Sequence, residues 1–341
     1  MGLRNASNVQ SDMEMLTSGD KLILTCKELC SIVAPSGREM PVLKYITNAL
    51  FQYGYLIEVD KIGNLIAHKK LRKHVKNIAL FAHMDSAGVI ITRKSLSNEL
   101  LWGSLSSWTK EKINNQPVIF DNGEEGIILY SEDATEKRVV NHSNNLSVGA
   151  IGAFKPTIKI ENDYLIGTFL DDRVGCAILI NLAKQLSTSK DNIFFVFTTQ
   201  EEVGNKGAMA VMNSHQFDES YIIDTTKCDV SSLGEGYVNL GYGPTYKVCD
   251  GAGFCSIELI SKIRTLQEKY KIKMQIEILT YAGSDIAAFR GKGDRSLFLG
   301  LSLPCDKMHT REEIVALQDL IGLFNLLKLL LRECYGAKYH N

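Results

Sequence analysis

Apolar runs that end directly in histidine or carboxylate side chains constrain the fold of this chain more than any other feature. The clearest run, Phe195-Val196-Phe197-Thr198, follows Asp191-Asn192 and leads into Glu201-Glu202. Aromatic and β-branched residues bounded by turn residues predict a buried strand. Because sites in open α/β sheets form at the carboxyl ends of strands, Glu201 and Glu202 lie where chemically active charge is expected. The alternative is that they only stabilise the N-terminus of a helix predicted over 205–215, by about 0.3–1 kcal/mol.

Four other predicted strand ends carry the same kinds of side chain. Any one of these groups alone would be interpreted as a helix cap or a surface carboxylate. Together with the Glu pair, however, they would place many carboxylates at one edge of a sheet. The five groups are His83 with Asp85, Asp171 with Asp172, Glu201 with Glu202, Asp224, and His309.

So many carboxylates in one crevice would repel one another unless cations neutralised them. Histidine and carboxylate ligands suit zinc, manganese or cobalt, and two ions about 3.5–4 Å apart can share one carboxylate. If Asp171, Glu202 and Asp224 are ligands, their three charges and one bridging hydroxide balance two divalent ions. Glu201 is then left free for proton transfer.

The composition excludes several other classes of protein. The chain has 341 residues, 45% of them hydrophobic, and a net charge of −1, which suits one large α/β domain or a main domain with a smaller one and disfavours nucleic-acid binding. The longest apolar stretch, 320–331, is interrupted by Asn325 and Lys328 and is too short to span a membrane, and the polar start of the chain predicts no secretory signal. The eight cysteines contain no CxxC pair and predict buried thiols, hence a cytoplasmic protein.

The residue pattern divides the chain into three parts. Residues 1–18 are polar and are expected to be a flexible N-terminus. Residues 19–88 and 165–341 alternate helical and strand patterns and predict one α/β domain, the catalytic one. Residues 89–164 contain short alternating segments separated by Asn, Asp, Gly and Ser, which predicts a small inserted all-β domain.

Two local patterns add detail near the N-terminus. Ser36 is expected to cap a helix predicted over 39–53, with Glu39 as its capping-box partner. The basic run 68–76 is typical of a charged loop between strands, although an anion site is an alternative.

Taken in combination and order, these motifs resemble a known family, the cocatalytic dinuclear metallo-aminopeptidases of the glutamyl, deblocking and tetrahedral type. The resemblance extends from about Leu29 to the C-terminus. Its motifs are Ala34-Pro35-Ser36-Gly37, Asp60-Lys61-Ile62-Gly63-Asn64, Ala82-His83-Met84-Asp85, Leu170-Asp171-Asp172-Arg173-Val174-Gly175, Gln200-Glu201-Glu202-Val203-Gly204 with Gly207-Ala208, and Ile223-Asp224.

The resemblance implies a role for each residue of the site. His83 and Asp224 would bind one metal, Glu202 and His309 the other, and Asp171 would bridge the two. Glu201 would be the general base that moves a proton from water to the leaving amine. Asp85 would fix the tautomer of His83. The implied cofactors are two divalent ions per chain, zinc in the first place, with cobalt or manganese as alternatives.

The resemblance also has structural implications. It implies a zinc-exopeptidase-like fold, in which a mixed sheet carries helices on both faces in three layers. It implies a cis peptide bond at Asp171-Asp172 and peptide substrates with a free N-terminus. The inserted domain would serve oligomerisation and access to the active site, and the expected homo-oligomer ranges from a dimer to a dodecamer because this domain is shorter than usual.

Three positions depart from the family pattern. Ser86 stands where the family usually has Glu after His-Met-Asp. Asp306-Lys307-Met308-His309 replaces Arg-Tyr-x-His, which changes the charge beside the second metal. Ala282-Gly283-Ser284-Asp285 replaces Gly-Gly-Thr-Asp.

Two alternative functions remain open. A related dinuclear-metal hydrolase acting on N-acyl amino acids or dipeptides would use the same ligands. A non-catalytic assembly protein of the same fold would be expected to lack Glu201 or a ligand, whereas all are present. A glycosidase is disfavoured because Glu201 and Glu202 are adjacent and cannot flank a sugar at the required separation of about 5–9.5 Å.

Overall fold

The computed structural model describes residues 18–106, 113–130, 137–140, 145–228, 236–251, 253–280, 283–289 and 296–340. The predicted flexible N-terminus therefore lies outside the described residues, except for Ser18, which begins a helix. Ala282 of the Ala282-Gly283-Ser284-Asp285 segment also lies outside them.

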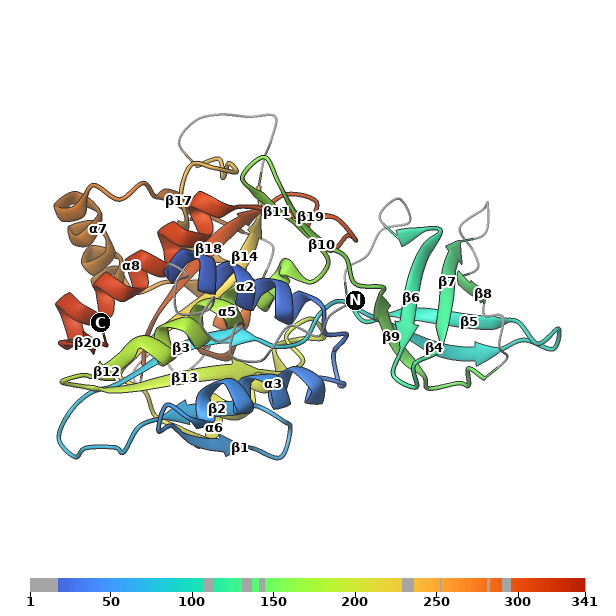
Figure 1. Ribbon diagram of the computed structural model, residues 1–341, viewed down its shortest axis with the longest axis horizontal. Coiled ribbons are helices and arrows are strands. Elements are labelled where there is room, and N and C mark those ends of the chain that lie inside the picture. Colours follow the sequence, from blue (N-terminus) through green and yellow to red (C-terminus); the bar gives the residue numbers. More distant parts are fainter. Residues whose placement is uncertain are drawn as a thin grey trace, which may run out of the picture.

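A nine-stranded mixed sheet forms the centre of the larger part of the molecule (Figure 1). The strand order is β1-β2-β13-β3-β14-β18-β15-β16, and β17 pairs with β15. The strands β13, β3, β14 and β18 run parallel. The first two are buried along nearly their whole length and carry apolar side chains between their polar ends, because both faces of the sheet are covered. The bounds are β1 Leu56–Val59, β2 Leu65–His68, β3 Asn77–His83, β13 Asn192–Thr198, β14 Glu219–Lys227, β15 Thr245–Asp250, β16 Gly253–Phe254, β17 Gln275–Ile278 and β18 Leu297–Cys305.

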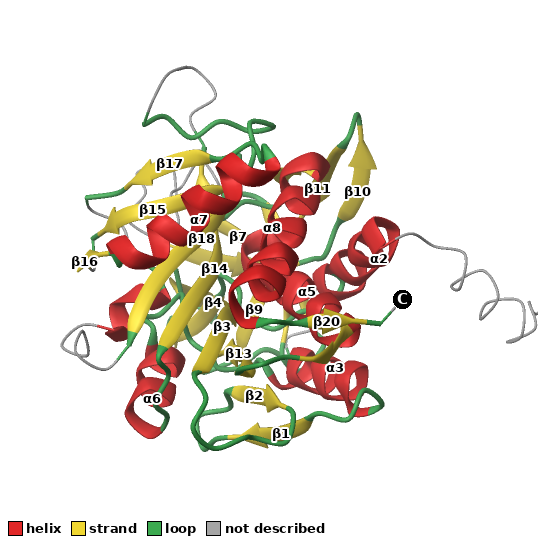
Figure 2. Ribbon diagram, turned by 90° about the vertical axis from the view of Figure 1, so that its left-hand side faces the viewer, coloured by secondary structure: helices red, strands yellow, loops and turns green. Residues whose placement is uncertain are grey.

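Helices cover both faces of this sheet. Figure 2 shows α2, α3, α5 and α8 on one side of the strands and α6 on the other. Helix α5 is buried from Leu170 to Ala183 because it contacts β3 and β14 on one side and α2 and α8 on the other. The predicted three-layer α/β fold is confirmed. The bounds are α2 Ser18–Cys30, α3 Met40–Phe51, α5 Leu170–Gln185, α6 Lys206–Ser214, α7 Ile257–Tyr270, α8 Leu317–Tyr335 and the 3₁₀-helix η1 Asp285–Phe289.

A closed barrel of short strands projects from the main sheet and has a separate apolar core (Figure 1). Trp102 and Phe120 are among the largest buried side chains of this core. The barrel lies wholly within the predicted inserted segment 89–164. Its strands, in spatial order, are β4 Val89–Lys94, β5 Leu100–Ser104, β8 Lys137–Val140, β7 Glu125–Tyr130, β6 Gln116–Phe120 and β9 Ile151–Phe154.

Two small sheets complete the described structure. A three-stranded sheet joins β10 Ile158–Glu161, β11 Tyr164–Gly167 and β19 Glu313–Ala316, and a two-stranded one joins β12 Leu186–Thr188 and β20 Lys338–Tyr339. The three-stranded sheet matters for the site, because β19 brings a distant part of the sequence beside the start of α5.

The predicted capping box at α3 is wrong. The N-cap residue of α3 is Glu39, and no side chain forms a cap hydrogen bond there. The Ser36 hydroxyl instead donates to Asp85 Oδ2 at 2.6 Å. Because the N-cap residue lies three positions after Ser36, this serine does not cap the helix, and its hydroxyl makes a charge-assisted hydrogen bond to Asp85.

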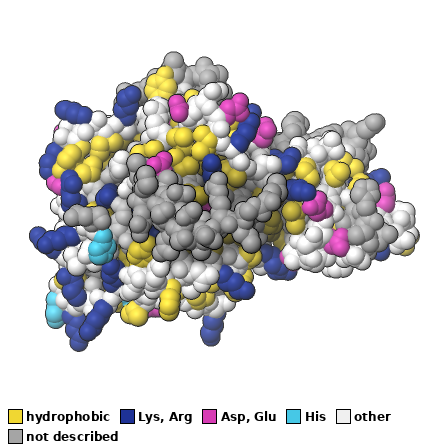
Figure 3. All heavy atoms as spheres, in the orientation of Figure 1, with side chains coloured by type: hydrophobic (Ala, Val, Ile, Leu, Met, Phe, Trp, Pro, Cys, Tyr) yellow, Lys and Arg dark blue, Asp and Glu magenta, His cyan; other side chains and the backbone are white. Residues whose placement is uncertain are grey.

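The surface matches the balanced composition. On the face drawn in Figure 3, the described Lys and Arg side chains are scattered rather than gathered in a basic stripe. In the predicted charged loop after β2, Lys69 donates to the carbonyl oxygens of Leu186 and Ser187. Its ammonium group therefore stabilises the contact between this loop and the segment after α5. Within the described ranges, no helix is both long and apolar enough to cross a membrane.

Candidate metal centre

The central strands bring the predicted site residues to one edge of the sheet. His83 is the last residue of β3, and Thr198, its partner in the parallel register, is the last residue of β13. Glu201 and Glu202 follow β13, while Asp224 lies in β14 on the other side of β3. This is the carboxyl edge of the parallel strands, where the sequence pattern places a site.

Asp171 lies between the two histidines. Its Oδ1 is 3.1 Å from His83 Nε2, and its Oδ2 is 3.1 Å from His309 Nε2. His83 Nε2 is also 3.7 Å from Asp224 Oδ1, and His309 Nε2 is 3.4 Å from Glu202 Oε2. The five side chains thus form two groups whose ligand atoms lie within 4.8 Å of one another, and both groups contain Asp171.

The charges of this centre suit divalent cations. Glu202 Oε1 is buried and forms no hydrogen bond with any described residue. Burial raises the pKa of Glu202 to about 7, and repulsion from Asp171 adds to this. Burial also raises the pKa of Asp224. A cation bound between these oxygens would remove both the unsatisfied acceptor and the repulsion.

The carboxylates of the centre also change the pKa values of the two histidines. Burial alone would lower the pKa of His309, but Glu202 and Asp171 raise it to about 9. His83 behaves similarly: its hydrogen bonds with Asp171, Asp224 and Asp85 raise its pKa well above the usual value despite burial. Because metal binding requires neutral imidazole, binding here would release protons.

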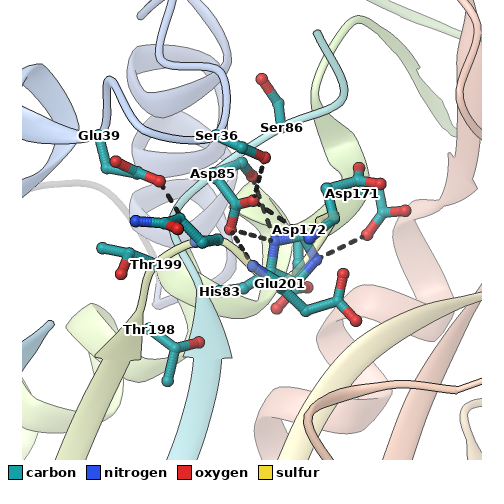
Figure 4. A network of polar contacts seen from close by, with 12 residues as sticks. Ser36, Glu39, His83, Asp85, Ser86, Asp171, Asp172, Thr198, Thr199 and Glu201 are labelled. Carbon is teal, nitrogen blue, oxygen red and sulfur yellow. Dashed lines mark hydrogen bonds and ion pairs between the residues drawn. The ribbon is translucent and has the colours of Figure 1, made fainter. Parts of the chain in front are cut away.

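Asp85 connects His83 to Glu201, as Figure 4 shows. Its Oδ1 is 3.4 Å from His83 Nδ1 and accepts the Glu201 N–H at 3.0 Å. Its Oδ2 accepts the Glu202 N–H at 3.2 Å and the Ser36 hydroxyl. The backbone carbonyl of Asp85 also lies 3.2 Å from His83 Nδ1. Asp85 therefore orients the imidazole through both groups, and its carboxylate fixes the backbone that carries Glu201 and Glu202.

Glu201 belongs to neither group of candidate ligands. Its Oε1 accepts a hydrogen bond from Asn205 Nδ2 at 2.9 Å, and Asn205 lies 3.4 Å from Asp285 Oδ1. Burial raises the pKa of Glu201 well above the usual value, and repulsion from Asp224 and Asp285 contributes. A carboxylate with raised proton affinity beside a metal centre suits general base chemistry.

Three contributors to the centre were missed by sequence reasoning. Glu313, the first residue of β19, accepts the His309 N–H at 2.8 Å and the Asp171 N–H at 3.2 Å. Ser106, just beyond β5 of the barrel, donates to Glu202 Oε2 at 2.8 Å. Nothing in the local sequence marks either residue. Asn205 could have been suspected, because it lies four residues after Glu201 in the same turn.

The cap interpretation of the Glu pair does not describe this site. Helix α6 begins after Asn205, and no side-chain cap hydrogen bond forms there. The peptide bond between Asp171 and Asp172 is cis, as the resemblance implies.

A three-layer α/β fold with two histidines, three carboxylates and a separate glutamate at its carboxyl edge defines a metal-dependent hydrolase. The family model of the M42 glutamyl aminopeptidases matches residues 133–326, and the chain belongs to this family. It is accordingly a metal-dependent aminopeptidase, a peptide hydrolase that uses divalent metal, and the family resemblance of the sequence is confirmed.

Individual relatives are similar to this chain over most of its length. A putative aminopeptidase of Acetivibrio thermocellus is 28% identical over 88% of this chain and 96% of its own length. The lysyl aminopeptidase of Pyrococcus furiosus is 24% identical over 81% of this chain and 87% of its own. The solved TET1 peptidase of Pyrococcus horikoshii superposes with a TM-score of 0.80 at 27% identity, covering 92% of this chain and 99% of that one.

Proposed function

We propose that this aminopeptidase binds two divalent ions through a shared Asp171. His83 and Asp224 would complete one site, and Glu202 and His309 the other. The observation that carries this proposal is the position of Asp171, whose two oxygens each lie 3.1 Å from a different histidine. Zinc is the ion we expect, because it accepts imidazole and carboxylate ligands together; cobalt and manganese are alternatives.

Bound divalent ions would polarise the scissile carbonyl and lower the pKa of a bound water. Glu201 takes the proton of the attacking water and passes it to the leaving amine. The hydrogen bond from Asn205 holds Oε1 of Glu201 and leaves Oε2 available for the proton. Asp85 holds His83 Nδ1, so that Nε2 faces Asp171 and Asp224.

The remaining polar contacts support this division of roles. Glu313 accepts hydrogen bonds from the backbone N–H groups of both Asp171 and His309. The positions of the bridging residue and of one histidine therefore depend on the same carboxylate. Ser106 holds Glu202 Oε2 and leaves Oε1 free. Because Ser106 comes from the barrel, we propose that the inserted domain, residues 89–164, helps to form the active site of the catalytic domain, residues 19–88 and 165–341.

We propose peptides with a free N-terminus as substrates. A metal or one of the surrounding carboxylates can hold the terminal ammonium group, which suits cleavage from the end of a chain. No observation specifically favours N-acyl amino acids or dipeptides, although the charge change at Asp306-Lys307 lies just before His309.

We also propose an oligomeric state and a cellular location for this protein. The structure of the Pyrococcus horikoshii relative is described as assembling into a tetrahedron or a large octahedral shell. We propose that this chain also forms a homo-oligomer, with a size from dimer to dodecamer. All eight cysteines are free and seven are buried, which supports a reducing, cytoplasmic environment.

The decisive experiment combines metal analysis with a substrate panel. The purified protein is expected to hold about two zinc equivalents per chain and to hydrolyse aminoacyl amides and short peptides with free N-termini. Glu201→Gln is expected to keep the metal and lose nearly all activity, because its amide cannot accept the proton. Full activity of that variant would rule out Glu201 as the base, and cleavage of acylated substrates alone would favour the N-acyl hydrolase alternative.

A further inference from the structure

A cavity lies between the catalytic domain and the barrel. It has a volume of about 440 Å³, within the usual range for small-molecule sites. It is lined by residues around the start of α3, by Ile62 and Gly63 of the turn before β2, and by Phe120 and Asp121 at the end of β6. None of the five proposed metal ligands lines it.

A buried carboxylate, that of Glu39, forms part of the cavity lining. Glu39 is only 6% exposed. Its Oε1 accepts the N–H groups of Gly37 at 2.7 Å and Gln200 at 3.2 Å, whereas Oε2 accepts no hydrogen bond from the described residues. Figure 4 shows Glu39 with one carboxylate oxygen engaged in the network of the site. Oε2 is not among the fully enclosed side-chain oxygens that lack a partner, so a donor inside the cavity can reach it. A cation is the donor that bonds most strongly to a carboxylate.

No side chain of the described chain supplies that cation. The neighbouring Arg38 also lines the cavity, but its guanidinium is occupied elsewhere: Nε donates to Asp121 Oδ2 at 2.7 Å and the group also donates to the Gly37 carbonyl at 2.9 Å. The cavity lining therefore contains two carboxylates, those of Glu39 and Asp121, and one guanidinium, that of Arg38. The balance of charge in the cavity is negative, which disfavours an anionic ligand.

The other walls are apolar and limit the kind of cation. Phe120 and Leu43 contribute buried side chains, and Met40 and Ile62 contribute partly exposed ones. A metal ion is disfavoured, since the metal-type side-chain groups among the described residues all belong to the centre at Asp171. An ammonium group on an apolar body fits both the single carboxylate and these walls.

We propose that this cavity binds a small primary amine with an apolar body. The ammonium group donates to Glu39 Oε2, and the apolar part packs against Phe120, Leu43 and Met40. Both a simple alkylamine and an apolar amino acid released by peptide hydrolysis carry an ammonium group on an apolar body. The proposal does not depend on the two-metal mechanism.

The site is coupled to the catalytic residues through the backbone. Thr199 lines the cavity, and Gln200, which donates to Glu39, directly precedes Glu201. Gln200 has a φ of 55°, a conformation that few residues other than glycine adopt, so the bond to Glu39 helps to hold a strained position. An occupant of the cavity therefore touches the segment that positions the proposed base.

Calorimetric titration of the zinc-loaded full chain tests the proposal. The probe is 3-methylbutylamine, with the neutral 3-methylbutan-1-ol as its matched analogue and leucine as the amino-acid arm. The amine is expected to bind about tenfold or more tightly than the alcohol, the effect of one hydrogen bond to a charged group. Leucine binding would identify released amino acids as a source of the ligand; its failure to bind would restrict the site to simple amines.

Variants separate this cavity from the metal centre. Glu39→Gln, which keeps an acceptor for Gly37 and Gln200, is expected to weaken amine binding about tenfold or more, whereas Glu201→Gln should leave it unchanged. Met40→Lys adds a positive charge at a 54% exposed position and should also weaken binding, while Met40→Leu should not. Met40→Lys decides the matter if Glu39→Gln does not fold. Undetectable amine binding, equal binding of amine and alcohol, or full binding by Glu39→Gln or by Met40→Lys would overturn the proposal.

Discussion

Asn205 Nδ2 donates a hydrogen bond to Glu201 Oε1 at 2.9 Å, from a backbone position with a φ of 58°. Asn is one of the few residues that tolerate this left-handed conformation, and here its side chain reaches back by four residues. The same amide lies 3.4 Å from Asp285 Oδ1. A neutral donor therefore separates two carboxylates and holds the proposed base in one orientation.

Replacement of Asn205 by glycine is expected to impair turnover. Asn205→Gly keeps the positive φ without strain and removes only the amide. We expect kcat to fall about tenfold or more, because a hydrogen bond to a charged group is lost, with KM and metal content little changed. Steady-state kinetics and metal analysis measure this. Asn162→Gly, at another positive φ of 49° in the β10–β11 turn, is the matched control and should keep wild-type kcat. An unchanged kcat in Asn205→Gly would show that Glu201 needs no such support.

Replacement of Glu313 is expected to weaken metal binding. In Glu313→Gln, the new amide NH₂ faces a backbone N–H of Asp171 or His309, so one of two hydrogen bonds is lost. Loss of such a supporting contact typically costs about 10–100-fold in metal affinity. Zinc titration against a competing chelator measures it. Glu312→Gln, at the adjacent exposed position, should bind zinc normally. Equal affinities of the two variants would argue against this role of Glu313.

Metal removal is expected to destabilise the protein. Chelation leaves the buried carboxylates of the centre without their counter-ions, so the unfolding temperature should fall and should recover when zinc is restored. At a free zinc concentration 100 times the dissociation constant, each site adds about 2.7 kcal/mol to the free energy of unfolding. Differential scanning fluorimetry at rising zinc concentration measures the recovery. In Asp171→Asn, zinc should raise the unfolding temperature much less than in the wild type. A rise as large as that of the wild type would contradict the proposal that Asp171 binds both ions.

Glu219 is expected to make stability depend on pH at the opposite end of β14. Burial alone would raise the pKa of Glu219, but hydrogen bonds from Lys262, Lys76 and Tyr335 outweigh it and lower the pKa. The contribution is therefore fully present above the unfolded pKa of about 4.3 and is lost as the pH falls through the lower folded value.

At pH 7, Glu219→Gln should lower the free energy of unfolding by about 1–3 kcal/mol, because two ammonium groups lose a charged acceptor. The difference from wild type should shrink below about pH 4. Denaturant unfolding at several pH values checks this. Glu258→Gln, which removes an exposed carboxylate 3.6 Å from the same Lys262, should have little effect. If the free energy of unfolding of Glu219→Gln stayed below that of the wild type by the same amount down to pH 3, the ionisation of Glu219 would not be the source of the pH dependence.

Local patterns were informative where one element carried its own signal. The apolar run at 195–198 predicted β13, and the helices predicted over 39–53 and 205–215 correspond to α3 and α6 with ends shifted by one or two residues. Strands β15 and β19 were missed because β15 contains charged residues, β19 has only four residues, and the positions of both depend on pairing with distant strands. Ser36 was assigned to a helix cap because its real partner, Asp85, lies 49 residues away in the sequence.

The sequence by itself determined the chemistry of this protein, because buried runs ending in His83, Asp171, Glu201, Glu202 and Asp224 suit only a limited set of reactions. The tertiary structure decided how those groups share their partners. Asp171 faces two histidines, Glu313 holds Asp171 and His309 together, and Ser106 reaches Glu202 from the barrel. These contacts join residues up to 142 positions apart, and such hydrogen bonds depend on packing that no local residue pattern encodes.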